Sequence, residues 1–451
     1  MSSSTDQSSK KYSPYQKTKF KVVPFKYRYG NNFGSTFRQT FHFLMESIEW
    51  SKQKIEDYQN QEFLKLIHHA YLNVPYYREL FDNNAIHLND IKSIGDIEKI
   101  PYLTKKIINN NKEKLIASNF SKPYHQFSTS GSTGEKLTFF GTDNLYKKEA
   151  AFVLRSYKLS GSNLYDKDSI WLRRYVPKNT YSPLYYYDYE LKRHYMSAYH
   201  INESNIFEFA KYINQTSADT IAAYPSSAYI LATLCEKFDL KLPKIQHIHL
   251  ASEMVLDEWA DKIEEVFGFK PVAHYGSIEK VIFMHQIKGS YTYFENKEYG
   301  VTEYLQNDVG SHSLVGTGFL NYLMPFIRYK TEDNVLITDN KSRFNTVEKI
   351  YGRSTDILIS SDGTKLPGVN FFSWVNKDLK GVKLFQIIQD VDKSIEFNFV
   401  PEDNFDDKTL IEIQKGLVSR LGELKISINK KNEIYRSKKT NKYKCIINKN
   451  F

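Results

Sequence analysis

The stretch Thr220-Ile-Ala-Ala-Tyr-Pro225 opens the part of the sequence that decides the fold, because an apolar run of strand length ends there at a proline. Two similar apolar runs follow, at Ile245 to Ala251 and at Val272 to Tyr275, and each is joined to a helical segment. Just before them, residues 206–213 carry apolar side chains at helical spacing. Alternation of strands and helices in this manner predicts an α/β core with much parallel sheet.

The C-terminal part of the chain has a different pattern. Ile395, Phe397 and Phe399 alternate with polar neighbours, as in a half-buried strand. Residues 410–421 then follow a helical period, and residues 426–428 alternate again. These patterns predict a small α+β unit, separated from the α/β core near Gly352–Asp356.

We therefore expect a large α/β domain with helix-covered sheets over residues 19–353 and a small α+β domain over residues 354–451. Residues 1–18 are expected to form a disordered leader. Within the large domain, apolar residues at helical spacing predict a helix over roughly residues 60–72.

Composition narrows the class of protein. The 451-residue chain is 41% hydrophobic, 25% charged and 15% aromatic, which is typical of a folded globular protein. Its two cysteines, Cys235 and Cys445, exclude a disulfide framework and a four-cysteine zinc site and agree with a reducing cytosol. The N-terminal residues do not resemble a secretory signal, and no stretch approaches the roughly 18 apolar residues of a membrane span. We expect a cytoplasmic protein that does not cross a membrane.

The formal charge is positive, because 62 Lys and Arg outnumber 52 Asp and Glu by 10. A basic balance of this size can favour nucleic acid, anionic lipid or phosphorylated cofactors. The lysines are spread along the chain instead of forming one basic arm. A solvated basic surface is therefore the simpler interpretation, and we do not expect a nucleic-acid partner.

The sharpest local signal is Ser128-Thr-Ser-Gly-Ser-Thr-Gly134, where hydroxyl side chains surround two glycines. Glycine lets the backbone approach a phosphate closely, and Ser and Thr hydroxyls donate to its oxygens. The segment is not a Walker P-loop, since the lysine and its spacing are absent. Taken alone, a run of Ser, Thr and Gly is more often a flexible surface loop than a phosphate site.

Four further polar motifs follow this loop in order. They are Ala251-Ser-Glu253 and His274-Tyr-Gly-Ser-Ile-Glu279 at the ends of apolar runs, then Arg328-Tyr-Lys-Thr-Glu-Asp333 and Gly352-Arg-Ser-Thr-Asp356. Near the C-terminus comes Thr440-Asn-Lys442. In this order the motifs resemble those of the adenylate-forming superfamily of acyl-CoA synthetases and related ligases.

Three other segments are similar to one branch of that superfamily, the phenylacetate–CoA ligase-like proteins and their capsular polysaccharide biosynthesis relatives. These segments are Val74-Pro-Tyr-Tyr-Arg78, Ile100-Pro-Tyr-Leu-Thr-Lys105 and Ala223-Tyr-Pro-Ser226. The resemblance runs from about residue 60 to the C-terminus. It implies a large N-terminal adenylation domain and a small, mobile C-terminal domain.

The resemblance also implies a nucleotide site. ATP phosphates would contact the loop residues Thr129, Ser130, Gly131, Ser132, Thr133 and Gly134. Ser252, Glu253 and Tyr275 would frame the adenine, with Gly276 and Ser277 beside it.

Four charged residues complete the implied site. Glu279 would bind Mg²⁺, a hard cation that takes carboxylate and phosphate oxygens. Asp333 would accept hydrogen bonds from both ribose hydroxyls, and Arg353 would contact ribose or phosphate. Lys442 would stabilise the negative charge that develops between the carboxylate and the α-phosphate.

Each residue also has an ordinary structural interpretation. Tyr275 could be a strand aromatic, Asp333 could belong to a turn before Asn334, and Arg353 could form a surface salt bridge. The position of Lys442 is uncertain by several residues because Lys438, Lys439 and Lys444 lie close to it.

Two other features allow alternatives. His247 and His249 share a strand face, but no third or fourth metal ligand is visible, so structural histidines are expected. The aromatic run Tyr181 to Tyr189 could stack on an aromatic substrate or form a packed cluster, and a packed cluster is the commoner outcome.

Five positions depart from the family pattern. Ile278 stands where Thr is usual beside the glutamate, Glu332 stands where Gly is common, and Thr355 stands at the usual hinge carboxylate. Glu135 and Leu137 replace basic residues often found after the phosphate loop. These changes predict a divergent member with an altered rate or acceptor.

The resemblance therefore predicts an enzyme that activates a small carboxylic acid with ATP and Mg²⁺ as acyl-AMP and transfers the acyl group to a thiol, with coenzyme A as the expected acceptor. An amine, a hydroxyl or a carrier in surface polysaccharide modification is the alternative acceptor, in association with polysaccharide biosynthesis enzymes. The competing hypothesis is a non-catalytic basic binding or scaffold protein.

Overall fold

The structure is a computed structural model of the chain. It describes residues 34–121, 124–128, 137–162, 167–173, 175, 183–189, 191–198, 200–307, 311–337, 345–353, 357–363, 365–367, 371, 374–375, 379–434 and 444–450, with the backbone alone at 352–353, 357 and 365–367. The predicted leader, residues 1–18, lies outside this part.

Helices form the N-terminal part of the described chain. They are α1 (Gly34–Glu46), α2 (Lys52–Asn73), α3 (Pro75–Asn83) and α4 (Lys105–Asn110), with 3₁₀ turns at Ser47–Glu49, Leu88–Asp90 and Ile94–Lys99. The predicted helix is α2, which begins earlier than expected because the Ser51 side chain accepts from the Lys54 backbone and caps it. Pro75 has no backbone N–H and occupies the first position of α3, so it ends one helix and begins the next.

A sheet of twelve strands forms the centre of the large unit, in the order β11-β12-β13-β14-β10-β9-β8-β7-β6-β3-β5-β4. The strands are β3 (Ser169–Arg173), β4 (Tyr185–Asp188), β5 (Arg193–Ser197), β6 (Thr220–Ala223), β7 (His247–Ala251), β8 (Val272–Gly276), β9 (Phe283–Gln286), β10 (Tyr293–Glu295), β11 (Gly300–Gln306), β12 (His312–Gly318), β13 (Tyr329–Ile337) and β14 (Thr346–Arg353). A separate hairpin, β1 (His125–Ser128) and β2 (Thr138–Gly141), flanks the phosphate-loop sequence.

The parallel sheet predicted from the sequence is confirmed but is only part of this sheet. β3, β5, β6, β7 and β8 run parallel, and every other pairing in the sheet is antiparallel. Apart from β4, which pairs with β5, the antiparallel strands follow β8 in the sequence, whereas parallel strands need helical crossovers.

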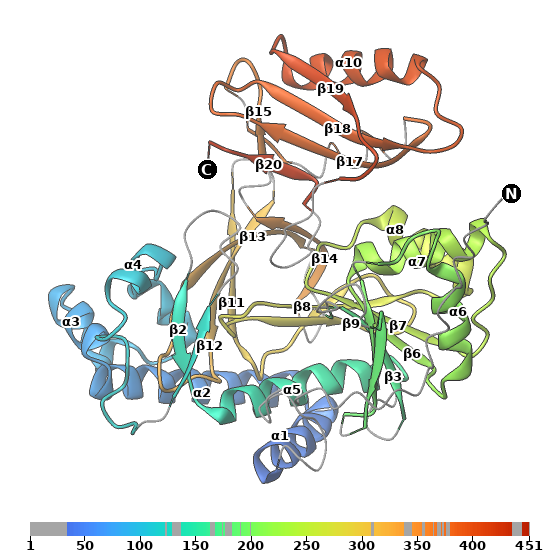
Figure 1. The fold of residues 1–451 in the computed structure, drawn as a ribbon. Coiled ribbons are helices and arrows are strands. Elements are labelled where there is room, and N and C mark those ends of the chain that lie inside the picture. The colour runs from blue at the N-terminus through green and yellow to red at the C-terminus, as the bar shows by residue number, and fades with distance from the viewer. Residues whose placement is uncertain are drawn as a thin grey trace, which may run out of the picture.

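Helices cover both faces of the parallel strands. They are α5 (Asp143–Leu159), α6 (Ile206–Gln215), α7 (Pro225–Lys237) and α8 (Asp257–Phe267). On one face, Ile221 and Leu250 share a buried cluster with residues of α6 and α7. On the opposite face, the ring of Tyr157 from α5 packs on His249, because side chains alternate between faces along a strand. Figure 1 shows these helices around the sheet.

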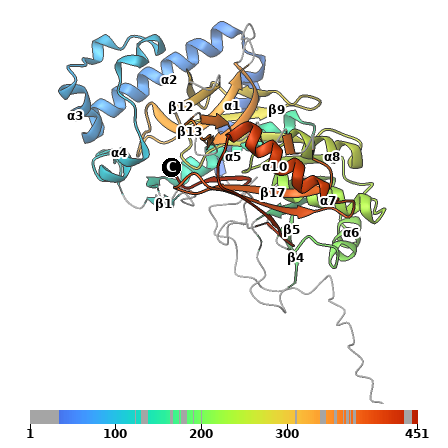
Figure 2. The same cartoon turned by 90° about the horizontal axis from the view of Figure 1, so that it is seen from above.

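A small unit follows the large sheet. It contains β15 (Ile357–Ile359), β16 (Lys365–Pro367), β17 (Val382–Gln389), β18 (Ile395–Pro401), α10 (Lys408–Leu421), β19 (Ile426–Lys430) and β20 (Ile446–Asn448). Its four-stranded sheet has the order β19-β18-β17-β20. The predicted strand, helix and strand of this region are β18, α10 and β19. Figures 1 and 2 show α10 on the side of this sheet that faces away from the large unit.

The small unit is docked against α7 and α8 in this structure. Trp259 of α8 belongs to the same buried cluster as Trp374 and Phe397 of the small unit. Lys237 at the end of α7 forms a 3.3 Å ion pair with Asp403. Because residues 354–356 lie outside the described part, the division at residue 353 stays a prediction.

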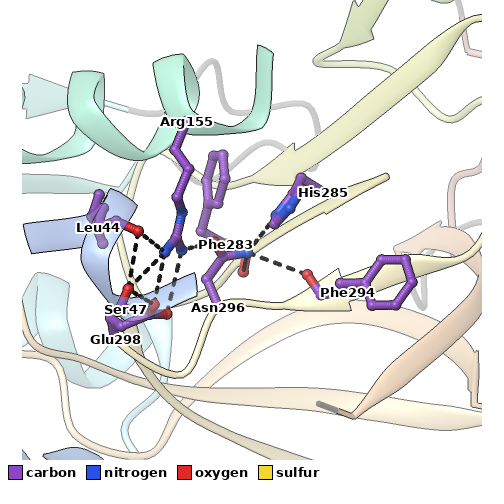
Figure 3. A network of polar contacts seen from close by, with 8 residues as sticks. All are labelled: Leu44, Ser47, Arg155, Phe283, His285, Phe294, Asn296 and Glu298. Carbon is purple, nitrogen blue, oxygen red and sulfur yellow. Dashed lines mark hydrogen bonds and ion pairs between the residues drawn. The ribbon is translucent and has the colours of Figure 1, made fainter. Parts of the chain in front are cut away.

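A buried polar network ties α5 to the N-terminal helices and to the antiparallel strands (Figure 3). Arg155 Nη1 lies 2.7 Å from Glu298 Oε1, and the Ser47 hydroxyl donates to the same oxygen at 2.6 Å. Asn296 contacts Arg155 and also lies 2.8 Å from His285 Nδ1. The network holds the segment after α1 against α5. Among the residues that the structure describes, no helix combines the length and apolarity needed to cross a bilayer.

Candidate active site

Candidate residues lie at the carboxyl ends of three neighbouring parallel strands. β6, β7 and β8 lie side by side and point the same way. Tyr224 follows β6, Ser252 follows β7, and β8 ends with Tyr275 and Gly276. Ligands of open α/β sheets bind outside the carboxyl ends of the strands. The strand order therefore gathers motifs that are far apart in the sequence at one edge of the sheet.

Tyr275 and Asp333 are joined directly. The Tyr275 hydroxyl donates to Asp333 Oδ2 at 2.6 Å. Burial first, and then the charge of Asp333, raise the pKa of Tyr275 well above its ordinary value, so the hydroxyl stays a donor at neutral pH. Asp333 lies within β13, not in a turn, so the turn interpretation of this residue is wrong.

A β-bulge positions Asp333. Ser313 of β12 pairs with Asn334, but Val315 pairs with Lys330, so residues 331–333 of β13 face one residue of β12. Within the bulge, the Thr331 hydroxyl accepts from the Asp333 backbone N–H at 3.2 Å. Bulges of this kind redirect a side chain and are frequent next to active sites.

Glu332, at the centre of the bulge, has a φ of 68°. Glycine adopts this left-handed conformation without steric cost, whereas a residue with a Cβ does not. The departure from the family pattern at this position therefore has a structural meaning, because the site requires a backbone conformation that glycine favours.

Glu279 lies in the turn after β8. The Tyr329 hydroxyl, at the start of β13, donates to Glu279 Oε1 at 3.2 Å. The next residue, Lys280, has a φ of 60° and forms a 2.6 Å ion pair with Glu149 of α5. The hydrogen bond from Tyr329 thus links the turn after β8 to β13. The same two strands carry Tyr275 and Asp333.

Ser277 lies between Tyr275 and Glu279 in the sequence motif at the end of β8. Its hydroxyl oxygen is buried and has no hydrogen-bond partner among the described residues. Buried polar groups in proteins almost always have a partner, so this hydroxyl is suited to bind an oxygen of a ligand.

Ser252 and Glu253 form the turn after β7. Ser252 has a φ of 75°, and residues held in this conformation are frequent at functional sites. Glu253 Oε2 accepts from the backbone N–H of Ser226 at 3.1 Å, in the first turn of α7. This contact joins two segments of the sequence motifs, and the role of Ser252 and Glu253 beside adenine stays a prediction.

The sequence did not identify the function of Arg328, the first residue of its motif. Arg328 is buried, its Nε donates to Glu303 Oε2 at 3.0 Å, and its Nη1 donates to the Ile100 carbonyl at 2.7 Å. Its guanidinium also lies 4.1 Å from the ring centroid of Tyr102. Arg328 therefore fastens the segment from residue 100 to 105 beside β13.

Tyr77 has a similar role in the other N-terminal motif. Its hydroxyl donates to the Pro325 carbonyl at 2.9 Å and accepts from the Ile327 N–H at 3.0 Å. The strand β13, which carries Asp333, is thus positioned by two sequence motifs that lie much earlier in the chain. In the sequence, these two motifs could be recognised only by the family resemblance, because their contacts with β13 join residues far apart in the chain.

Several predicted site residues lie outside the described part of the chain. They are the whole phosphate loop (Thr129, Ser130, Gly131, Ser132, Thr133 and Gly134), Glu135, Thr355 with Asp356, and Lys442. For Arg353 the backbone is described, and it pairs with Asp333 across β13 and β14. The strands β1 and β2 place the two ends of the phosphate loop in one hairpin.

The histidine pair is arranged around a side-chain hydrogen bond. His249 Nε2 lies 2.5 Å from the Ser162 hydroxyl, and burial lowers the pKa of His249 well below its ordinary value. Among the described residues, no group of three or more His, Cys, Asp or Glu side chains could hold a metal ion.

In the described part of the tyrosine run, Tyr185 stacks on Tyr212 of α6, with ring centroids 3.8 Å apart.

The residues that are described fit a nucleotide with Mg²⁺. Asp333 would offer a carboxylate to ribose hydroxyls, Glu279 would offer a carboxylate to a hard cation, and Ser277 would offer the hydroxyl that has no partner among the described residues. Mg²⁺ is commonly held by one or two carboxylates together with substrate phosphates, so a single glutamate is sufficient.

Comparison with known proteins agrees with this arrangement. Residues 358–449 match the family model of the CapK C-terminal domain. The chain is 25% identical to protein CapK of Staphylococcus aureus, over 81% of this chain and 82% of that protein. It is 24% identical to the phenylacetate–coenzyme A ligase of Aromatoleum evansii, over 77% of this chain and 81% of that enzyme.

Among solved structures, the chain is similar to 2-hydroxyisobutyryl-CoA ligase in the post-adenylation state in complex with R3-HIB-AMP. The TM-score is 0.67 at 15% identity, and the similarity covers 86% of this chain and 88% of that chain. This similarity shows the predicted fold of a large α/β domain with a small α+β domain, and the predicted homology is confirmed.

Proposed function

We propose that this chain, an adenylate-forming ligase homologous to CapK and to the phenylacetate–coenzyme A ligases, activates a carboxylic acid with ATP and passes the acyl group to a thiol. One observation carries the proposal. Tyr275 and Asp333, from different motifs, share a hydrogen bond of 2.6 Å at the carboxyl edge of the parallel strands. A partly buried pair that presents a carboxylate and an aromatic ring suits a nucleoside, because ribose offers hydroxyl donors and adenine offers a flat face.

In the first half-reaction, an oxygen of the substrate carboxylate attacks the α-phosphorus of ATP. The bond between the α-phosphorus and the bridging oxygen breaks, and pyrophosphate leaves. Asp333 would orient the ribose, and Glu279 would hold the cation close to the phosphates. The predicted phosphate loop and Lys442 would balance the negative charge that develops at the reacting oxygens.

In the second half-reaction, the sulfur of a thiolate attacks the acyl carbon, and AMP leaves. The small unit would have to move between the two steps, because groups needed for the first step would block the thiol. We propose that the chain turns at Thr355–Asp356, between the end of β14 and the start of β15.

Coenzyme A is the acceptor that we propose first, since relatives of this chain are coenzyme A ligases. An amine, a hydroxyl or a carrier remains the alternative acceptor. The match to the CapK C-terminal domain supports a place in surface polysaccharide modification. We propose that the enzyme acts in the cytoplasm, where ATP and coenzyme A are available.

A pyrophosphate-exchange assay tests the first half-reaction. The protein is incubated with ATP, Mg²⁺, labelled pyrophosphate and each acid of a panel, and label in ATP is measured. We expect exchange with particular acids only, and loss of exchange in Asp333→Asn. The matched control is Asp168→Asn, because Asp168 also accepts from a tyrosine hydroxyl, that of Tyr187, at 2.8 Å. No exchange with any acid would overturn the proposal and favour the scaffold hypothesis.

A further inference from the structure

We propose that the acid which this enzyme activates carries a second anionic group, and that Arg173 is the residue that selects it. The inference rests on the proposed function and adds the substrate class. It comes from a partly buried cationic side chain beside the candidate site, two of whose nitrogens are buried without a hydrogen-bond partner among the described residues.

Arg173 is the last residue of β3 and lies at the same edge of the sheet as the candidate site. β3 pairs with β6 so that Leu172 faces Ala223, and β6 pairs with β7 so that Ala223 faces Leu250. One residue further along, Arg173 is therefore level with Tyr224 and Ala251, which lie at the carboxyl ends of the strands. A substrate bound at this edge can reach Arg173.

The Arg173 guanidinium lies under α5 among neutral groups. Its charge acts on His249 and His274, and burial together with that charge lowers the pKa of both histidines, to about 3 for His274. Tyr157 of α5 packs on the same two histidines, with ring centroids 4.1 Å and 5.9 Å away. The histidines are therefore uncharged at neutral pH. Lys280 also acts on His274 but is paired with Glu149, whereas Arg173 has no carboxylate partner among the described residues.

The described residues do not provide hydrogen-bond acceptors for all the nitrogens of the Arg173 guanidinium. Nε and Nη2 of Arg173 are buried, and in the part of the chain that the structure describes they have no hydrogen-bond partner and no ion pair with an Asp or Glu. The Tyr157 hydroxyl, on the helix above, is also buried without a partner among the described residues. Buried charges in proteins are normally paired and hydrogen-bonded, because leaving one unpaired is costly.

The aromatic neighbour of Arg173 does not remove this cost. The guanidinium carbon lies 5.3 Å from the ring centroid of Trp171, which is within the range of a cation–π interaction. Such a contact stabilises the charge but accepts no hydrogen bond from Nε or Nη2. By contrast, Arg193 lies 3.7 Å from the same ring and donates to the Tyr195 hydroxyl at 3.3 Å.

A carboxylate is the ligand that matches these two nitrogens. Nε and Nη2 lie on one edge of the planar guanidinium and can donate two parallel hydrogen bonds to the two oxygens of a carboxylate. The Tyr157 hydroxyl and the histidines are neutral hydrogen-bonding groups that can surround it. The substrate class is therefore a dicarboxylic acid, with one carboxylate activated at the nucleotide and the other bound by Arg173.

The test compares matched acids in the pyrophosphate-exchange assay. Phenylacetate is paired with 1,4-phenylenediacetate, and hexanoate with adipate, so that each pair differs in a distal carboxylate. We expect kcat/KM to be at least 10-fold higher for the diacid of one pair, since a site built around a buried charge rejects an analogue that leaves it unpaired. Arg173→Met should abolish this preference, and Arg173→Lys should restore part of it.

Two controls separate substrate selection from a structural role. Arg193→Met removes the other cation beside Trp171 and should leave the preference unchanged. The melting temperature of Arg173→Met should equal or exceed that of the parent, because the substitution removes two buried guanidinium nitrogens that have no partner among the described residues. A purely structural arginine would lower it.

The outcomes distinguish the two proposals. Equal kcat/KM for the monoacid and the diacid of every pair, or a diacid preference that Arg173→Met leaves unchanged, would overturn the inference and retain the proposed function. Exchange with neither monoacids nor diacids, in the parent or the variants, would overturn both.

Discussion

The Tyr275 hydroxyl donates a 2.6 Å hydrogen bond to Asp333 Oδ2, although three strands lie between β8 and β13 in the order of the sheet. The curvature of the sheet brings these strands together, and the bulge in β13 directs Asp333 toward Tyr275. The pair links the two halves of the candidate nucleotide site.

This pair gives the first prediction. Asp333→Asn should weaken ATP binding by about 1–3 kcal/mol, the cost of losing hydrogen bonds to a charged group. Tyr275→Phe should weaken it less, and the two effects should not add, because the residues are in contact. ATP KM values for both single variants and the double variant measure this coupling. Tyr187→Phe is the control, since Tyr187 forms a similar bond to Asp168 outside the candidate site; additive effects would contradict the prediction.

The second prediction concerns the positive φ of Glu332. Glu332→Gly should raise the free energy of unfolding relative to Glu332→Ala by about 1 kcal/mol, because glycine adopts φ 68° without a Cβ clash. In the same strand, Lys330→Gly should instead destabilise the protein by about 0.5–1 kcal/mol. Denaturant unfolding of the three variants provides the measurement. Equal effects of glycine at both positions would count against strain at Glu332.

The third prediction concerns Glu279 and Mg²⁺. Glu279→Gln keeps the size of the side chain and removes its charge, so pyrophosphate exchange should fall and require a higher Mg²⁺ concentration. Tyr329→Phe removes the hydrogen bond to Glu279 but keeps the carboxylate, so its Mg²⁺ requirement should change less. Identical Mg²⁺ titrations for Glu279→Gln and the parent would exclude the metal role.

The fourth prediction is a pH dependence of stability that arises from Glu298. Burial acts to raise the pKa of Glu298, but the charge and hydrogen bonds of Arg155 and the Ser47 hydroxyl lower it from 4.5 to about 2. Because the pKa in the folded state is depressed, the stabilisation is complete above pH 4.5 and is lost as the pH falls from 4.5 to about 2. Its size is about 3 kcal/mol.

The measurement is the free energy of unfolding at several pH values in this range. Replacing both partners, in Arg155→Met with Glu298→Met, should flatten the pH dependence, whereas Arg155→Met alone should destabilise the protein by about 3–5 kcal/mol at neutral pH. The same acid sensitivity in parent and double variant would show that other groups cause it.

The fifth prediction assigns Lys442 to the first half-reaction alone. Lys442→Ala should lower acyl-AMP formation by about 10²–10³-fold and leave the reaction of a supplied acyl-AMP with the thiol intact. Both half-reactions are measured for Ala variants of Lys438, Lys439, Lys442 and Lys444. Selective loss in a neighbour would move the assignment to that lysine, and normal adenylation in all four would reject the mechanism.

The local elements and the family could be predicted from the amino-acid sequence alone. Apolar periodicity predicted α6, β6, β7, β8, β18, α10 and β19, because period two and period 3.6 are properties of a single segment. The order of short motifs predicted the homology that the comparisons confirmed. The family pattern also indicated that glycine is common at position 332, but it did not show that the backbone there has a positive φ.

Which of these residues are in contact could be seen only in the folded chain. The contact between Tyr275 and Asp333 depends on the curvature of a twelve-stranded sheet and on a bulge, and neither can be derived from the pattern of one segment. Arg173 was not identified from the sequence, because an arginine at the end of a strand has no distinctive pattern. Its unpaired nitrogens became visible only when α5 and three neighbouring strands were placed around it, since hydrogen-bond satisfaction and burial are properties of the folded chain.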